Sequence, residues 1–251
     1  MASELDFRHW DRRQVGMDLT YPMIHGDGRA IGQFTAPVIA SGNASFDAGS
    51  AYVPSLNGDG KLQSADNPTA SFTFNNTTYE ATMMCWFKSI AREGGDNTIF
   101  FQTHGSLHSV GKNAAWFSPI TIGTAAYGGY ANFQCYSQGG DNRGVYKVNY
   151  LWSSFTSTNW NHFCFVVKST ATGGDGLPRF YLNGSLTATG AVAVYQIARD
   201  MSGPVTFFSY YNNTTMEVAG RIQFASLMFR ALTAQDIYSI YKTQLAQFNK
   251  A

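Results

Sequence analysis

Residues 160–184 read Trp-Asn-His-Phe-Cys-Phe-Val-Val-Lys-Ser-Thr-Ala-Thr-Gly-Gly-Asp-Gly-Leu-Pro-Arg-Phe-Tyr-Leu-Asn-Gly. The apolar run 163–167 has the composition of a β-strand, and a Gly-rich connection follows it at 172–176. The second apolar segment ends on Asn183-Gly184, and Asn-Gly beside strand-like residues is the strongest short signal for a β-hairpin. This stretch therefore predicts antiparallel strands.

Further motifs extend the pattern in both directions. They are the run Glu-Ala-Thr-Met-Met-Cys-Trp-Phe-Lys at 80–88, the strand-like segment 45–53 and the run Ala-Ser-Leu-Met-Phe-Arg-Ala-Leu-Thr at 225–233. Together with the Trp-x-His strand and the Tyr-Leu-Asn-Gly strand, their order over residues 45–242 resembles the laminin-G-like, concanavalin A-like lectin/glucanase jelly-roll superfamily. The resemblance implies an all-β, two-sheet antiparallel sandwich with a short helix at its edge after the last strand. Proteins of this fold more often serve as binding or structural modules than as enzymes.

The chain divides into two parts by composition. Residues 1–40 concentrate charge early and are then punctuated by Pro and Gly, which predicts an arm with little regular structure. Residues 41–251 are expected to form the jelly-roll domain. Its last element is a helix over 233–248, because Thr233 can cap it and Asp236 stands three residues later in the reciprocal capping position. The apolar residues at helical spacing are Ile237, Tyr238, Ile240, Tyr241, Leu245 and Phe248.

Two apolar runs, 83–87 and 163–167, are continuous rather than alternating. A strand with one wet face alternates, so continuous runs predict that both faces are covered. We expect the second sheet on one side and an arm, a loop or a neighbouring molecule on the other. Charged residues make up 13% of the chain, about half the usual share, which also suggests a surface partly covered by partners.

The overall charge and hydropathy exclude several classes. A net charge of +1 argues against a dedicated nucleic-acid binder. The sequence contains no run of eighteen apolar residues, so no membrane span is expected. The first residues lack the apolar core of a signal peptide. Cys85, Cys135 and Cys164 are odd in number, lie in strand-like runs and are expected to be buried free thiols.

Catalysis is not expected, and a glycoside hydrolase with carboxylates assembled from separate strands is kept only as the third alternative. Retaining glucanases of this fold need two carboxyl groups about 5 Å apart, supplied by residues two apart on one strand. The glutamates Glu4, Glu80, Glu93 and Glu217 are not near one another in sequence, and none has an Asp at the required offset. His162 matches the strand histidine of the family and is interpreted as a half-buried residue bonded to a neighbouring strand or loop.

No cofactor is expected, with one alternative. Calcium occurs at the rim of many relatives and needs several oxygen ligands. Asp141 and Asn142, in the loop 138–144, are the candidate ligands, although turn residues of this kind more often bond to backbone.

Glycan binding needs aromatic faces for stacking with neutral polar groups around them. The candidates in or beside Gly- and Asn-rich stretches are Trp116, Tyr127, Tyr130, Tyr210, Tyr211 and Asn212. Aromatic residues are also the usual anchors of protein interfaces, and that alternative stays open.

The function expected from these observations is a non-catalytic structural or adhesive module. The absent secretion signal and the low charge favour a virus or bacteriophage surface protein, such as a capsid decoration, knob or tail component, made in the host cytoplasm. We expect a homo-oligomer or a complex with other virion subunits, docked through arm residues Phe7, Arg8, Trp10, Arg12 and Arg13. The rival class is a stand-alone, extracellular lectin, calcium dependent or not, with its site on the loops that hold Tyr127, Asp141 and Tyr210.

Overall fold

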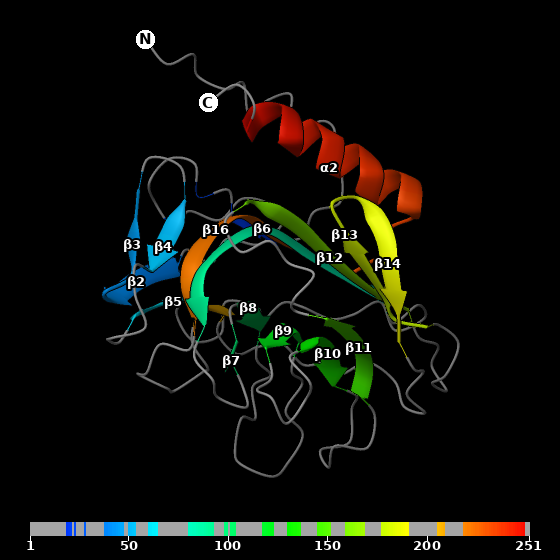
Figure 1. Cartoon of the computed structure of the whole chain (residues 1–251), viewed down its shortest axis with the longest axis horizontal. Coiled ribbons are helices and arrows are strands. Elements are labelled where there is room, and N and C mark those ends of the chain that lie inside the picture. Colours follow the sequence, from blue (N-terminus) through cyan, green and yellow to red (C-terminus); the bar gives the residue numbers. More distant parts are fainter. Residues whose placement is uncertain are drawn as a thin grey trace.

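A computed structural model describes sixteen stretches of the chain, and all structural statements below concern them. They are residues 19–21, 23, 28, 38–47, 50–53, 60–64, 80–92, 98–99, 101–103, 117–122, 130–136, 145–151, 159–168, 177–190, 205–208 and 218–248. Two antiparallel sheets of eight strands each lie face to face, and one helix lies on the outer side of the first sheet (Figure 1). The expected two-sheet jelly-roll sandwich is confirmed.

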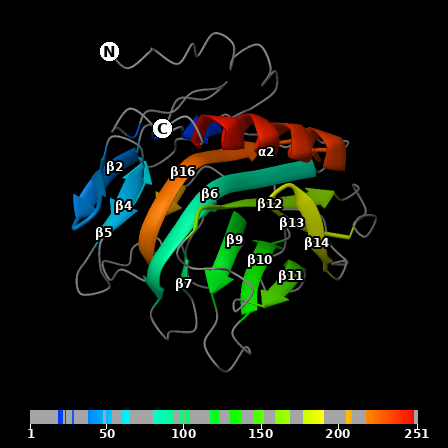
Figure 2. The same ribbon diagram turned by 45° about the horizontal axis from the view of Figure 1, so that its top comes forward.

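The first sheet, sheet A, has the strand order β14-β13-β12-β6-β16-β4-β3, with β1 also paired to β16. Its strands are β1 (Leu19–Tyr21), β3 (Ser45–Phe46), β4 (Ala51–Val53), β6 (Glu80–Arg92), β12 (Asn161–Lys168), β13 (Arg179–Leu182), β14 (Ser185–Thr189) and β16 (Val218–Met228). The long strands β6 and β16 run side by side through its centre (Figure 2).

The second sheet, sheet B, has the order β11-β10-β9-β8-β15-β5-β2, with β7 paired to β9. Its strands are β2 (Val38–Gly42), β5 (Gly60–Ser64), β7 (Thr98–Ile99), β8 (Phe101–Thr103), β9 (Phe117–Ile122), β10 (Tyr130–Tyr136), β11 (Val145–Leu151) and β15 (Val205–Phe207).

The hairpin at the decisive stretch forms as expected. Strands β13 and β14 are joined by Asn183 and Gly184, whose φ angles of 51° and 79° are those of a type I′ turn. Gly184 also lies against the helix, because a Cβ there would come within 2.8 Å of Cδ1 of Tyr241. The turn therefore requires glycine both for its backbone angle and for its contact.

The continuous apolar runs are buried on both faces, as predicted. All described residues from Ala81 to Phe87 on β6, and from Asn161 to Val167 on β12, are buried. Phe87 and Phe163 pack with ring centroids 6.3 Å apart. Cys85 and Cys164 are buried free thiols, and desolvation raises the pKa of each.

The cover over the outer face of sheet A is the chain's own helix, α2 (Ala234–Phe248). The sequence led us to expect an arm, a loop or a neighbour there, and a helix only at the edge. Between β16 and α2, Thr233 caps the helix as predicted: its Oγ1 accepts from the Asp236 N–H at 3.1 Å, and the Asp236 carboxylate accepts from the Thr233 N–H at 3.1 Å. The buried residues between sheet and helix, called the outer cluster here, are Met84, Trp86, Cys164, Val166, Tyr181, Phe224, Met228, Leu232 and Ile237.

The segment 1–40 is not free of regular structure. Strand β1 pairs with β16 over Leu19 to Tyr21, and the buried Thr20 hydroxyl donates to Oγ of Ser226 at 3.0 Å. Met23 is also buried. This part of the expected arm therefore belongs to the sandwich, because it is hydrogen-bonded to the chain's last strand, β16.

The neighbour of β16 changes halfway along that strand. Its first half pairs with β4 and its second half pairs with β1, and the register against β6 shifts between Gln223 and Ser226. Phe224 lies in this bulge with a φ of 49°. A left-handed conformation is costly for a phenylalanine, and its burial in the outer cluster holds it there.

Candidate functional site

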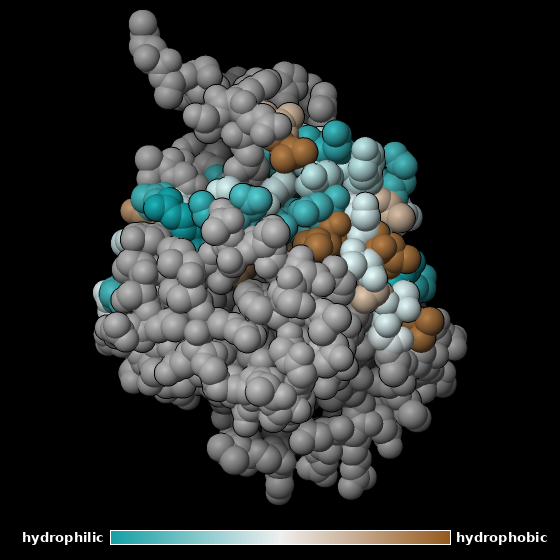
Figure 3. Space-filling view, in the orientation of Figure 1, coloured by the Kyte–Doolittle hydropathy of each residue, from teal (hydrophilic) through white to brown (hydrophobic). Residues whose placement is uncertain are grey.

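The outer face of sheet A is sealed by α2. Trp86 is 2% exposed, its Nε1 donates to Oε1 of Gln244 at 2.6 Å, and its ring stacks on Tyr241 with centroids 5.6 Å apart. This face serves stability and offers no open surface over the outer cluster. On the surface that Figure 3 colours, hydrophobic residues lie scattered among hydrophilic ones.

His162 has a structural role. Its ring is fully buried against both Trp86 and Tyr241, at centroid distances of 5.3 and 5.8 Å. Its backbone is held by Asn183, whose Oδ1 accepts from the His162 N–H at 2.8 Å. Desolvation lowers the pKa of His162 to about 3. The expected bond to a neighbouring loop is made by the backbone, but the expectation of half burial is wrong: burial is complete, and the ring nitrogens have no hydrogen-bond partner among the described residues.

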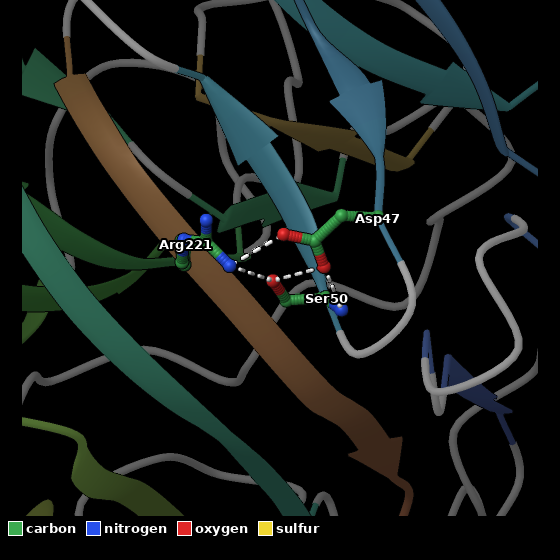
Figure 4. Close-up of polar contacts among 3 residues, drawn as sticks. All are labelled: Asp47, Ser50 and Arg221. Carbon is green, nitrogen blue, oxygen red and sulfur yellow. Dashed lines mark hydrogen bonds and ion pairs between the residues drawn. The ribbon is translucent and has the colours of Figure 1, made fainter.

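A polar cluster at the other end of sheet A is also structural (Figure 4). The Asp47 carboxylate accepts from the Ser50 N–H at 2.8 Å and the Ser50 hydroxyl at 3.0 Å, and it forms an ion pair with Arg221 of β16. These bonds fix the turn between β3 and β4 against the central strand. The sequence predicted one strand over 45–53; the Asp47 turn divides it into two.

The one glutamate within the described residues, Glu80, is likewise engaged. Its carboxylate lies 2.7 Å from Nζ of Lys168 and accepts from the Ala231 N–H at 2.9 Å. Burial alone would raise the pKa of Glu80, but the bonds to Lys168 and Ala231 bring it below its ordinary value. Glu80 thus ties the end of β16 to β6 and β12. The described residues contain no group of three or more His, Cys, Asp or Glu that could hold a metal.

The outer face of sheet B has a different character. From Val205, the first residue of β15, to Phe208, every residue is fully buried, so this strand is covered on both faces, whereas Ile39 on the edge strand β2 is 71% exposed. Residues directly opposite on neighbouring strands share a face. The register therefore assigns the outer-face positions strand by strand.

One row of outer-face positions crosses nearly the whole sheet. Gln63 pairs with Thr206, and Thr206 pairs with Gln102. The pairing of Thr103 with Phe117 places Ser118 next to Gln102. Ser118 then pairs with Gln134, and Gln134 with Lys147. This set is called the polar row. Its members, from β5 to β11, are Gln63, Thr206, Gln102, Ser118, Gln134 and Lys147.

Strand β10 contains two tyrosines at alternating positions. It pairs with β11 without a register shift, and Tyr130, Asn132, Gln134 and Tyr136 occupy alternate positions, with Ala131, Phe133 and Cys135 between them. Neutral amides between two tyrosines are the residue types that the sequence analysis sought for glycan binding.

Two members of the polar row carry buried oxygens that lack a partner. They are Oε1 of Gln63 and Oγ1 of Thr206, which have no hydrogen-bond partner within the described part of the chain. The two residues are directly opposite on adjacent strands. Thr206 is itself fully buried, so its hydroxyl lies beneath other parts of the protein and is closed to a ligand.

Most residues proposed from the sequence lie outside the described stretches. These are Trp116, Tyr127, Tyr210, Tyr211, Asn212, Asp141, Asn142 and the arm residues Phe7, Arg8, Trp10, Arg12 and Arg13. Tyr130 is described as the first residue of β10.

The strand ends nevertheless show from where the chain leaves for those residues. β10 begins and β15 ends at one end of sheet B, whereas β10 ends and β11 begins at the opposite end. Tyr127, Tyr210 and Asp141 themselves lie outside the described residues. The sequence reasoning did not identify Gln63, Gln102, Thr206 and Gln134. Alternation in 130–136 was a usable signal for β10, but the row itself depends on pairing between distant segments.

Comparison with solved structures shows the same fold in binding domains. The receptor-binding domain of a botulinum neurotoxin C/D mosaic serotype has a TM-score of 0.63 and 13% identity, covering 92% of this chain and 52% of that one. A botulinum neurotoxin type C structure has a TM-score of 0.60 and 12% identity, covering 93% and 52%. Domain 4 of AbnA, an extracellular arabinanase from Geobacillus stearothermophilus, has a TM-score of 0.55 and 15% identity, covering 90% and 98%.

At these identities the likeness shows the fold alone, and the chain spans about half the length of the neurotoxin structures. A search of curated protein sequences found no match. A family model matches residues 56–238, most of the jelly-roll domain. With its two-sheet sandwich and this match over most of its length, the chain belongs to the concanavalin A-like lectin/glucanases superfamily.

Proposed function

We propose that the protein is a non-catalytic, adhesive module that binds glycans through the outer face of sheet B. The observation that carries this proposal is the alternation along β10, where Tyr130, Asn132, Gln134 and Tyr136 occupy every second position of the strand. Aromatic rings stack on sugar faces, and amides both donate to and accept from hydroxyl groups. Over the outer cluster, the outer face of sheet A is covered by α2 and is closed to a ligand.

The fold neighbours support a binding role. The AbnA domain was solved in complex with arabinotriose. The cell entry of botulinum neurotoxin type C depends on its interaction with two ganglioside molecules. We propose that the protein is not an enzyme. Its one described glutamate, Glu80, pairs with Lys168 and accepts a hydrogen bond from the Ala231 N–H, which gives it a structural role.

A glycan array probed with the full-length chain tests this function. We expect binding to a defined set of glycans that is reduced at least about fivefold by Tyr130→Ala or Tyr136→Ala, because each removes a stacking surface. Tyr238→Ala is the control, since Tyr238 is 47% exposed on α2 and lies away from sheet B. We expect no cofactor requirement, so that a chelator leaves binding unchanged; loss of binding in chelator would instead support calcium at Asp141 and Asn142. If no glycan is bound above the level of the two tyrosine variants, the proposed function is wrong.

We further propose that this module works in an outward-facing assembly such as a virion surface, where the segment before β1 docks it to neighbouring subunits. The charged and aromatic residues Phe7, Arg8, Trp10, Arg12 and Arg13 and the low overall charge support this proposal. The stand-alone extracellular lectin is the alternative. The described residues contain no helix long and apolar enough to cross a membrane.

Two truncations separate docking from stability. Deletion of residues 2–17 is expected to leave the thermal midpoint unchanged and to convert an oligomer into a folded monomer in light scattering. Deletion of residues 2–24 is expected to lower the thermal midpoint as well, because it removes β1, the Thr20–Ser226 hydrogen bond and buried Met23. An unchanged solution mass after the shorter deletion would contradict a docking role in self-assembly.

A further inference from the structure

We infer that α2 is an acid-released cover: proton uptake by the buried ring of His162 lifts the helix from sheet A and exposes the outer cluster, while the strands of the sandwich stay paired. The form with α2 on the sheet is called closed here, and the form with α2 lifted is called open. The inference is independent of the proposed glycan binding, because it concerns the side of the sandwich that α2 covers (Figure 2). Three observations carry it: unbonded polar atoms beneath α2, the engagement of the carboxylates around His162, and the attachment of the helix.

Unbonded polar atoms gather beneath α2 around Trp86. The strand register places His162 of β12 opposite Trp86, and Gln223 of β16 opposite it on the other side. Gln244 of α2 accepts a hydrogen bond from Nε1 of the same tryptophan. Both ring nitrogens of His162, Oε1 of Gln223 and Nε2 of Gln244 are buried and have no hydrogen-bond partner within the described part of the chain. Because an unbonded buried polar group costs free energy, opening this interface to water recovers hydrogen bonds that the closed form lacks.

The carboxylates of the elements around His162 are engaged with other groups. Glu80 of β6 pairs with Lys168, which lies six positions along β12 from His162, about 20 Å at the usual rise of a strand. Asp236, in the first turn of α2, accepts from the Thr233 hydroxyl at 2.7 Å. The titratable and charged groups of these elements on this side of sheet A are Cys164 and Lys168 of β12, Glu80 and Lys88 of β6, Arg179 and Tyr181 of β13, and Asp236, Tyr238, Tyr241 and Lys242 of α2. A protonated His162 therefore has no counter-charge from these elements in the closed form.

Burial determines the direction of the pH effect. Desolvation in the closed form lowers the pKa of His162 from 6.5 to about 3. In the open form the ring meets water and regains its ordinary pKa, so the open form binds the proton more strongly. Acid therefore shifts the equilibrium toward the open form as pH falls below 6.5. With these two pKa values the ratio of open to closed molecules rises about 25-fold between pH 7 and pH 5.

The helix can leave more easily than the strand that carries His162. Strand β12 is hydrogen-bonded to β6 on one side and to β13 on the other, so moving His162 out of the sheet would break both pairings. Helix α2 is the last described element and takes part in no strand pairing. Its described links to sheet A are side-chain contacts, such as the bond of Gln244 to Trp86 and the stacking of Tyr241 on the same ring. Water therefore reaches the ring of His162 with the smallest loss of structure when α2 moves.

The connector between β16 and α2 confines the movement to the helix. The Thr82 hydroxyl of β6 donates to the carbonyl of Arg230 at 2.7 Å and accepts from the Leu232 N–H at 3.1 Å. Glu80 accepts from the Ala231 N–H at 2.9 Å. Because the pKa of Glu80 lies below its ordinary value, its carboxylate stays charged at pH 5 and this bond persists. The connector thus stays fixed to β6, and the movement begins at the cap residue of α2.

Hydrogen exchange of the full-length chain at pH 7 and pH 5 tests the inference, with each amide rate corrected for the intrinsic effect of pH on exchange. We expect the protection of α2 amides to fall about 25-fold and to be insensitive to low urea, which is the behaviour of a local opening. Amides of β6 and β12 should stay more protected than those of α2 at pH 5, and their exchange should rise with urea. Constant protection of α2 from pH 7 to pH 5 would overturn the inference. So would equal protection and equal urea dependence of α2 and β12, because α2 would then open only with the whole sandwich.

His162→Phe is the variant that tests the assigned residue. Its ring cannot take up a proton, so the protection of α2 should lose its pH dependence. The variant retains His9, His25, His104 and His108, so an undiminished 25-fold fall in it would assign the effect elsewhere and overturn the inference. Lys242→Ala, an exposed position on the same helix, is the matched control and should keep the full pH dependence. Thermal unfolding checks that both variants are folded, and the comparison of α2 with β12 in the unsubstituted chain decides the matter if His162→Phe is not.

Discussion

Replacement of Trp86 with alanine is expected to lower the free energy of unfolding by about 4 kcal/mol, as measured by urea denaturation. Trp86 is among the largest fully buried side chains, and it connects three elements: its own strand β6, the histidine of β12 and helix α2. The substitution opens a cavity in the outer cluster. It also leaves Oε1 of Gln244 without its donor beneath the helix, which adds the cost of a buried unbonded acceptor.

Two further variants separate these contributions. Trp86→Phe keeps most of the packing but removes the Nε1 donor, so it should cost less than the alanine change, about 2 kcal/mol. Leu186→Ala is the control, because Leu186 is 54% exposed on β14 and its loss should change stability by no more than about 0.5 kcal/mol. Equal effects of Trp86→Ala and Leu186→Ala would show that α2 does not cover sheet A in solution.

Acid is expected to destabilise the protein well above the pH at which carboxylates titrate. The pKa of His162 falls from 6.5 to about 3 on folding, because burial disfavours the charged ring. The folded state therefore binds fewer protons than the unfolded state, and stability falls as pH drops below 6.5. The expected loss is about 2 kcal/mol at pH 5 and about 3 kcal/mol at pH 4, measured as the free energy of unfolding in urea at each pH.

His162→Phe is the variant that isolates this effect. A phenylalanine ring can keep the packing against Trp86 and Tyr241 and carries no titratable group, so the slope between pH 6.5 and pH 5 should flatten. Glu80 and Asp236 have pKa values below their ordinary ones, so their contribution is lost only at lower pH, as pH falls through their folded values. A slope between pH 6.5 and pH 5 that persists unchanged in His162→Phe would contradict the assignment to His162.

The sequence gives a strong account of local structure. Asn183-Gly184 predicts the hairpin because few residues adopt two successive left-handed conformations. Thr233 and Asp236 predict the start of α2 because the side chain of each accepts a hydrogen bond from the backbone N–H of the other. The unbroken apolar runs of β6 and β12 predict burial on both faces. Each of these signals lies within a short stretch of chain, where neighbouring residues decide the conformation.

What covers the second face could not be read from the same pattern. An apolar run shows that a partner is needed, but not which segment supplies it; here α2 lies over sheet A, with Gln244 bonded to Trp86 from a position 158 residues away. The full burial of His162 and the joining of β1 to β16 have the same origin. They depend on contacts between segments that are far apart in sequence, and the free energy of those contacts is not encoded in either segment alone.

The sequence by itself therefore determined the antiparallel hairpins, the capped helix, the buried strands and, through the order of its motifs, the family. Only the tertiary structure decided that α2 closes one sheet, and that six residues from six separate strands form the polar row across the other. Strand alternation tells which residues of one strand share a face. Register between strands, which the packing of the whole sandwich sets, tells which residues of different strands become neighbours.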